Sequence, residues 1–198
     1  MNKRKKNVTM AVILMIIASI GGLLYWLWVK SIALPILGEL NSYEAETVDG
    51  EKFMIQDGKV KVVLFAEENC SDECEEMYGA LEELQERLKK DKNFGTKVDM
   101  LSIAENPQMD KKIIEHYKDT YHVDVKGWKF LFVPNEKLEL FKNQINDKKE
   151  AEPSVTLIDA KGNIRQHYQL KDEEEIEQLR KDINQLIRIH QQSIEERR

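Results

Sequence analysis

Residues 62–74 read VVLFAEENCSDEC, and this stretch decides the fold. Its first half is apolar and rich in β-branched residues, which predicts a buried strand. An acidic stretch of helix-forming residues follows and predicts a helix over 72–90. Cys70 and Cys74 therefore lie where a core strand is followed by a helix, which is where α/β folds place their chemistry.

Cys70 and Cys74 are the only cysteines of the chain, and their spacing is informative. Four helical residues advance the chain by about 6 Å, a Cα separation that a disulfide accepts. Such a pair could close a disulfide, pass one to another protein, or hold a soft metal ion between two thiolates. The alternatives are two unrelated buried cysteines or a structural disulfide. A structural disulfide usually closes a long loop, and this pair would close a very short one, so the spacing favours a functional pair.

The N-terminus predicts a membrane anchor. A basic segment over 1–7 precedes an uncharged, mostly apolar run over 8–29, which is long enough to cross a hydrocarbon core as a helix. The positive charges are expected to stay in the cytoplasm, so the domain that follows is expected outside it, at the cell membrane. A cleaved signal peptide is the competing interpretation, but its apolar core would normally be shorter. An extracytoplasmic dithiol meets an oxidising environment, which indicates redox or metal chemistry.

The net charge of the chain limits the classes of partner that it can bind. The formal net charge of the 198-residue chain is −6, and the part after Val29 is more negative still because the N-terminal segment is purely basic. A surface that acidic does not suit nucleic acid, so none is expected as a partner. The membrane and extracytoplasmic protein thiols are the expected partners instead.

The rest of the chain predicts an α/β domain over 37–192, reached through a linker over 30–36 and followed by a polar tail over 193–198. Asp49–Gly50 predicts a hairpin, and the remaining elements follow from hydrophobic periodicity. The expected strands cover 43–48, 52–55, 59–65, 97–103, 128–133, 155–159 and 164–169, and the expected helices cover 72–90, 110–121, 134–145 and 172–192. This order is that of a thioredoxin-like domain, a mixed central sheet flanked by helices.

Several segments resemble the Sco family. The stretch Phe65–Cys74 is similar to that family's phenylalanine, short turn and CxxxC. The segment Leu101–Ile103, with Pro107 and Asp110, is similar to its SIDPExD segment, and Leu157–Gly162 is similar to its terminal hairpin. The similarity covers about 37–187, together with the single N-terminal anchor that is typical of such proteins.

The resemblance implies a thioredoxin-like factor that assists assembly of the binuclear copper centre of cytochrome c oxidase. It further implies that Cys70 and Cys74 bind copper, as Cu(I) or Cu(II), or act as thiol reductants on an oxidase subunit. The positive end of the following helix is expected to stabilise a thiolate at Cys70. Cys70 is therefore expected to be the more reactive thiol and Cys74 the resolving one.

The chain departs from the family pattern at the third copper ligand. The family histidine aligns with Ala151, and the chain's histidines lie elsewhere, at His116, His122, His167 and His190. Without an imidazole, Cu(I) would have two thiolates, and its affinity should fall. The prolines that usually follow the two cysteines are replaced by Ser71 and Glu75.

Pro153 is a further departure. Thioredoxin-like oxidoreductases place a cis-proline at the start of the strand that faces the active cysteines, and Pro153 is at the matching position. The alternative is an ordinary proline at the first residue of a strand. Two main functions stay open: a Sco-like factor for oxidase copper assembly, and a general extracytoplasmic thiol-disulfide oxidoreductase with no copper role. A tethered binding domain with a vestigial disulfide is the non-enzymatic alternative.

Overall fold

The structure, a computed structural model, describes residues 15–22, 34–104, 109–145 and 154–197, which divide into two compact units, Met1–Pro35 and Ile36–Arg198. Residues 15–22 of the first unit are helical. The rest of the predicted anchor over 8–29 lies outside the described residues. In the part of the chain that is described, no helix combines the length and the apolar character needed to span a bilayer.

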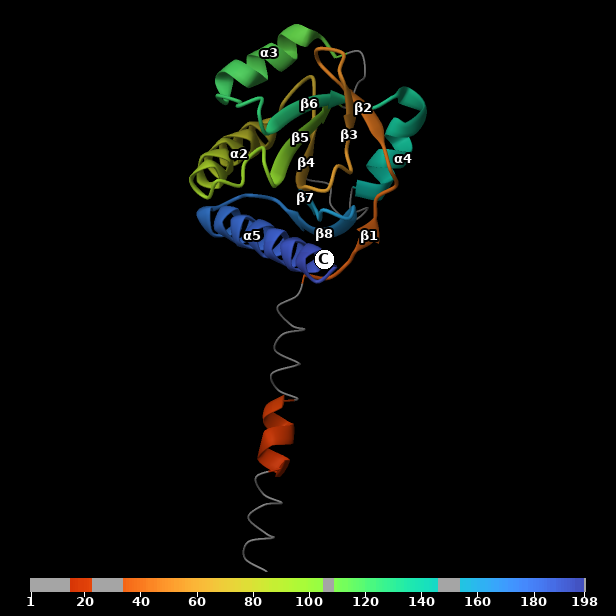
Figure 1. Ribbon diagram of the computed structural model, residues 1–198. Helices are drawn as coiled ribbons and strands as arrows, with labels where there is room; N and C mark the ends of the chain where they lie inside the picture. Colours follow the sequence, from red (N-terminus) through yellow and green to blue (C-terminus); the bar gives the residue numbers. More distant parts are fainter. Residues whose placement is uncertain (1–14, 23–33, 105–108, 146–153, 198) are drawn as a thin grey trace, which may run out of the picture. The chain divides into compact units, whose positions relative to one another are not determined.

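The second unit is built on a mixed sheet (Figure 1). Among the described residues the sheet has eight strands in the order β1-β8-β7-β4-β5-β6-β2-β3. The strands are β1 (Gly38–Glu39), β2 (Glu44–Thr47), β3 (Lys52–Met54), β4 (Val60–Ala66), β5 (Val98–Ala104), β6 (Trp128–Phe132), β7 (Val155–Ile158) and β8 (Asn163–Tyr168).

The centre of the sheet is parallel. β4 pairs with β5 over its whole length, β5 pairs with β6, and β7 runs antiparallel on the other side of β4. Every residue of β5 is buried, and so is every residue of β4 except the half-buried Phe65. Continuous burial is typical of parallel strands that are covered on both faces, which explains why these segments are mostly apolar rather than alternating.

Helices cover both faces of the sheet (Figure 1). They are α2 (Asp72–Lys90), α3 (Lys111–Thr120), α4 (Asn135–Ile145) and α5 (Glu173–Glu195). α2 and α5 contact each other, and α5 also contacts β4. α4 packs Leu138, Phe141 and Ile145 against Val63 and its neighbours on β5 and β6. The central strands therefore end between two helical layers, and β4 leads directly into the segment that carries the cysteines.

The predicted order of strands and helices is confirmed, with two differences. The two-residue strand β1 was not predicted; it pairs with β8 through Gly38 and Glu39. α5 continues to Glu195 rather than ending at Gln192. β1 depends on its pairing with β8 rather than on local sequence, and the ends of helices are the least predictable part of an element.

Candidate functional site

Cys70 and Cys74 form a disulfide, with their Cα atoms 5.3 Å apart. Cys74 is buried in the first turn of α2, whereas Cys70 is half-buried and lies just before the helix begins. The structure thus brings the two cysteines together at the carboxyl end of the central parallel strands. The exposed fractions differ, so an incoming thiol has easier access to Cys70 than to Cys74.

The helix begins next to the disulfide because Ser71 caps it. The Cys74 backbone N–H donates to the Ser71 Oγ at 3.3 Å, and the Glu75 N–H donates to the Ser71 carbonyl at 2.9 Å. Acidic residues fill the first turn and basic residues the last, which suits the helix dipole. The positive end of α2 therefore lies at the sulfur pair, where it favours negative charge on sulfur.

Acidic side chains around the pair act in the opposite sense. Hydrogen bonds from its own backbone N–H and from the Ser71 hydroxyl lower the pKa of Glu73. This carboxylate is therefore ionised at neutral pH beside the disulfide. Glu75 and Glu76 add exposed negative charge on the same helix. Like charge disfavours a thiolate, although water screens these exposed groups.

Tyr117 of α3 lies against the buried sulfur. Its hydroxyl oxygen is 3.9 Å from the Cys74 Sγ and donates a hydrogen bond to the Glu67 carbonyl at 3.1 Å. Burial, with a smaller effect from Tyr121 and nearby carboxylates, raises the pKa of Tyr117 to about 12. The phenol therefore remains protonated at physiological pH and connects α3 to both the sulfur pair and the loop that carries it.

An aromatic cluster holds the Tyr117 ring in place. Tyr78, one helical turn after Cys74, lies at its centre, with its ring centroid 4.5 Å from Tyr117 and 5.1 Å from Tyr121. Trp128 and Phe130 of β6 stack on Tyr78 from the sheet. Tyr78 is fully buried, and burial raises its pKa far above the ordinary value. The Tyr117 hydroxyl is thus positioned by a rigid, mostly apolar support.

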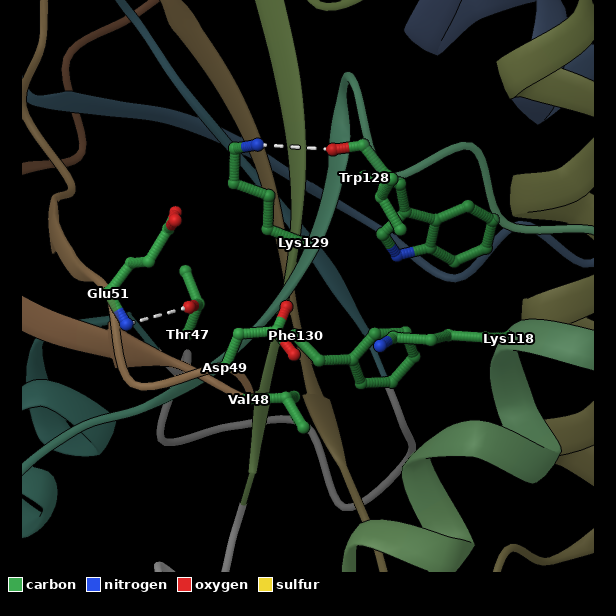
Figure 2. A pocket seen from close by; sticks show the side chains of 9 residues that line it. Thr47, Val48, Asp49, Glu51, Lys118, Trp128, Lys129 and Phe130 are labelled. Atoms are coloured by element: carbon green, nitrogen blue, oxygen red, sulfur yellow. Dashed lines mark hydrogen bonds between the residues drawn. The ribbon is translucent and has the colours of Figure 1, made fainter.

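A small pocket is lined in part by Trp128 and Phe130 of this cluster (Figure 2). It has a volume of about 180 Å³, and its lining includes Lys118, Lys129 and Phe130. Lys118 pairs with Glu115 at 2.9 Å, and Lys129 donates to the Val125 carbonyl at 3.1 Å. The two ammonium groups are therefore already engaged within the protein.

The sequence has no histidine at the position of the family's third copper ligand. Within residues 15–22, 34–104, 109–145 and 154–197, no group of three or more His, Cys, Asp or Glu side chains is arranged to hold a metal ion. His122 has 79 % of its side chain exposed and pairs with Glu82. His167 lies on β8, 3.0 Å from the Thr156 hydroxyl. Once reduced, the two cysteines are the thiolate donors that the chain offers to Cu(I).

Two predicted positions lie outside the described residues. These are Pro153, for which the sequence left a cis bond and an ordinary proline both open, and Ala151, which aligns with the family histidine. β7 begins soon after them, at Val155, and its register places Thr156 opposite Val63 of β4. The start of β7 is thus close to the end of β4 from which the cysteine loop leaves.

Sequence reasoning did not assign Tyr117 to the site. In the helix expected over 110–121, Tyr117 lies three residues after Ile114, and both side chains are buried. The contact with Cys74 joins residues 43 positions apart. Such a pairing has no local signal, because it depends on how α3 packs against α2.

Comparisons with known proteins agree on the fold. No family model and no curated protein sequence matches the chain. An SCO1/SenC family lipoprotein from Bacillus anthracis is similar in structure, with 23% identity, a TM-score of 0.64, and coverage of 78% of this chain and 99% of its own. BsSco, a member of the Sco family of cytochrome c oxidase assembly proteins with an identified disulfide switch, has 20% identity and a TM-score of 0.65 over 77% and 95%. Copper-bound ScoI of Bradyrhizobium japonicum has 15% identity and a TM-score of 0.57 over 74% and 98%.

Proposed function

We propose that the chain is a Sco-family protein, because the domain has the thioredoxin-like fold of Sco proteins and its disulfide lies at the start of α2. The apolar run over 8–29 is the proposed membrane anchor. The protein assists assembly of the copper centre of cytochrome c oxidase through reversible thiol–disulfide chemistry at Cys70 and Cys74. The observation that carries this proposal is the closed Cys70–Cys74 pair, because it spans only four residues and adds little chain-entropy stabilisation to the fold.

The proposed reaction is reduction of a disulfide on an oxidase subunit. The Cys70 thiolate attacks one sulfur of that disulfide, and the electron pair leaves on the subunit's other sulfur, which takes up a proton. The Cys74 thiolate then attacks the Cys70 Sγ, and the electron pair leaves on the subunit's first sulfur. The subunit ends with two thiols and this chain with its disulfide, so electrons and protons balance.

Copper in this account is cargo. Cys70 and Cys74 supply two thiolates, which suit Cu(I), and within the described residues no group of three or more His, Cys, Asp or Glu side chains is arranged to hold a metal ion. Thiol reduction is therefore the leading role of the pair, and weak Cu(I) binding is the second. The same observation favours the alternative function, a general extracytoplasmic thiol-disulfide oxidoreductase with no copper role.

An experiment on cells that lack the protein distinguishes these two functions. We expect these cells to lose the electron paramagnetic resonance signal of the oxidase copper centre, and expression of the unaltered chain should restore that signal. Cys70→Ser and Cys74→Ser should fail to restore it, while Ser71→Ala, which leaves both sulfurs in place, should succeed.

Two other outcomes would contradict the proposed role in oxidase assembly. An intact oxidase signal, with disulfides accumulating in other extracytoplasmic proteins, would support the general oxidoreductase. Full restoration by either serine variant would contradict both functions, since each needs the two sulfurs.

A further inference from the structure

The Tyr117 hydroxyl is the polar side-chain group that contacts the Sγ of Cys74, the buried sulfur of the pair, within the described residues. A disulfide sulfur carries no proton, so between Tyr117 Oη and Cys74 Sγ the tyrosine hydroxyl is the sole donor. Its one proton now goes to the Glu67 carbonyl at 3.1 Å, and the sulfur lies at 3.9 Å. The hydroxyl therefore faces both acceptors and needs only a small reorientation to favour the sulfur.

Reduction of the disulfide changes the balance between these acceptors. When an external thiolate bonds to the more exposed Cys70 Sγ, the Cys70–Cys74 bond breaks and its electron pair moves onto the Cys74 Sγ. A sulfur that gains negative charge is a better acceptor than a neutral carbonyl, because charge-assisted hydrogen bonds are about twice as strong as neutral ones. A donor that lies within reach of the developing charge, and can turn its proton towards it, lowers the barrier to that step.

We propose that the Tyr117 hydroxyl stabilises Cys74 as the leaving sulfur, and thereby directs external thiols to Cys70. The step is balanced by a dithiol reductant: its first thiolate forms the mixed disulfide with Cys70, and Cys74 takes up a proton. Its second thiolate then attacks the reductant's own sulfur in the mixed disulfide, and Cys70 leaves as a thiolate. This inference rests on the proposed redox function and adds the residue that sets its direction.

The aromatic cluster explains why this tyrosine is suited to the task. Tyr78 and Phe130 contact the Tyr117 ring from α2 and β6, so the ring is fixed while the hydroxyl can rotate. Tyr121 lies in the same cluster, 6.1 Å from Tyr117 between ring centroids, but within the described residues its hydroxyl makes no hydrogen bond to either sulfur. Tyr121→Phe is therefore a matched control for Tyr117→Phe.

The test measures reduction of the oxidised full-length chain by dithiothreitol, a reductant that carries no charge other than that of its attacking thiolate. Samples are quenched with acid, and free thiols are counted by alkylation and mass spectrometry. We expect Tyr117→Phe to slow reduction by about threefold to tenfold, in line with the loss of one hydrogen bond. Tyr121→Phe should leave the rate unchanged.

A second readout separates this role from simple support of the fold. Brief exposure to glutathione, followed by peptide mapping, gives the ratio of adducts on Cys70 and Cys74. Tyr117→Phe should lower the preference for Cys70, and 3-fluorotyrosine at position 117, a stronger donor, should raise the rate of reduction. An unchanged rate and adduct ratio in Tyr117→Phe, with the pair still cycling, would overturn this inference and leave the redox function standing. A pair that resists reduction in every variant would instead overturn the redox function.

Discussion

At the scale of the residue, Lys61 and Asp99 form a buried ion pair that joins β4 to β5. Lys61 is in β4 with its side chain 2% exposed, and its ammonium lies 2.7 Å from Asp99, which is fully buried on β5. Asp57 and Lys59 complete the cluster, so two positive and two negative groups balance. These residues lie near the amino ends of the two strands, away from the cysteines, and their role is structural.

Asp99→Asn should destabilise the domain strongly. The substitution leaves the Lys61 ammonium buried with Asp57 as its remaining carboxylate, and breaking a buried pair costs about 3–5 kcal/mol. Urea unfolding measures the free energy of unfolding. Glu44→Gln breaks the exposed pair with Lys52 and serves as the control, with little change expected. If the two substitutions lowered the free energy of unfolding equally, the buried ion pair would contribute no more to stability than the exposed one.

Ala151 is the residue on which copper affinity depends in this account. Ala151→His supplies the imidazole that the Sco family places at this position, and we expect it to strengthen Cu(I) binding at least tenfold, about 1.4 kcal/mol. Competition of the reduced chain against a Cu(I) chelator measures the affinity. Lys149→His, two residues earlier in the sequence, is the control for a nearby imidazole in general. Tight binding by the unaltered chain that Ala151→His does not change would mean that another residue completes the site.

The sequence predicted the sulfur pair but not its surroundings. Cys70 and Cys74 follow a recognisable strand and precede a recognisable helix, so local pattern was enough to locate them. Tyr117 and Lys61 were beyond such reasoning, because each acts through a partner about 40 residues away in the chain. Hydrophobic periodicity shows which way a side chain faces, but not which group it meets.

At the scale of the element, charged side chains connect α2 to α5. Arg87 of α2 binds Glu173 and Glu177 of α5, and Arg180 binds Asp91 just after α2. Hydrogen bonds from Arg180, together with those from Arg87, hold the pKa of Glu177 at about 2, below its ordinary value of 4.5. The ionised form of Glu177 therefore favours the folded state.

This pKa shift predicts a pH dependence. Because the folded-state pKa is lowered, the stabilisation is complete above about pH 4.5 and is lost as the pH falls towards 2. Glu177→Gln should lower the melting temperature at pH 6, and the difference from the unaltered chain should shrink by pH 2.5. Glu174→Gln, on an exposed position of the same helix turn, is the control and should change neither. A constant difference at both pH values would contradict the assignment to Glu177.

The elements themselves were largely predictable. α2 has a serine cap, an acidic first turn and a basic last turn, so its bounds match those expected from the sequence. β4 and β5 are mostly apolar runs, and their burial on both faces follows. β1 was missed because two residues carry no periodicity, and its existence depends on pairing with β8.

At the scale of the whole molecule, the proposed arrangement is a cytoplasmic N-terminus, an anchor over 8–29 and an extracytoplasmic domain. Protease added to intact spheroplasts should therefore remove the domain from Leu34 onward, since the basic N-terminal segment keeps the start of the chain inside. A cytoplasmic protein serves as the control for intact membranes. Protection of the domain would contradict the orientation, and a mature N-terminus near Leu34 would contradict the anchor.

The proposed function depends on one property, the reversible redox chemistry of Cys70 and Cys74. The bond closes a loop of only a few residues, so it lacks the long-loop stabilisation of a structural disulfide. The most direct test is a titration of the full-length chain in glutathione and dithiothreitol buffers, with free thiols measured by alkylation. We predict a reduction potential above about −300 mV, the range of exchangeable rather than structural disulfides. A disulfide that stays oxidised well below that potential would make the pair structural and would contradict the proposed function.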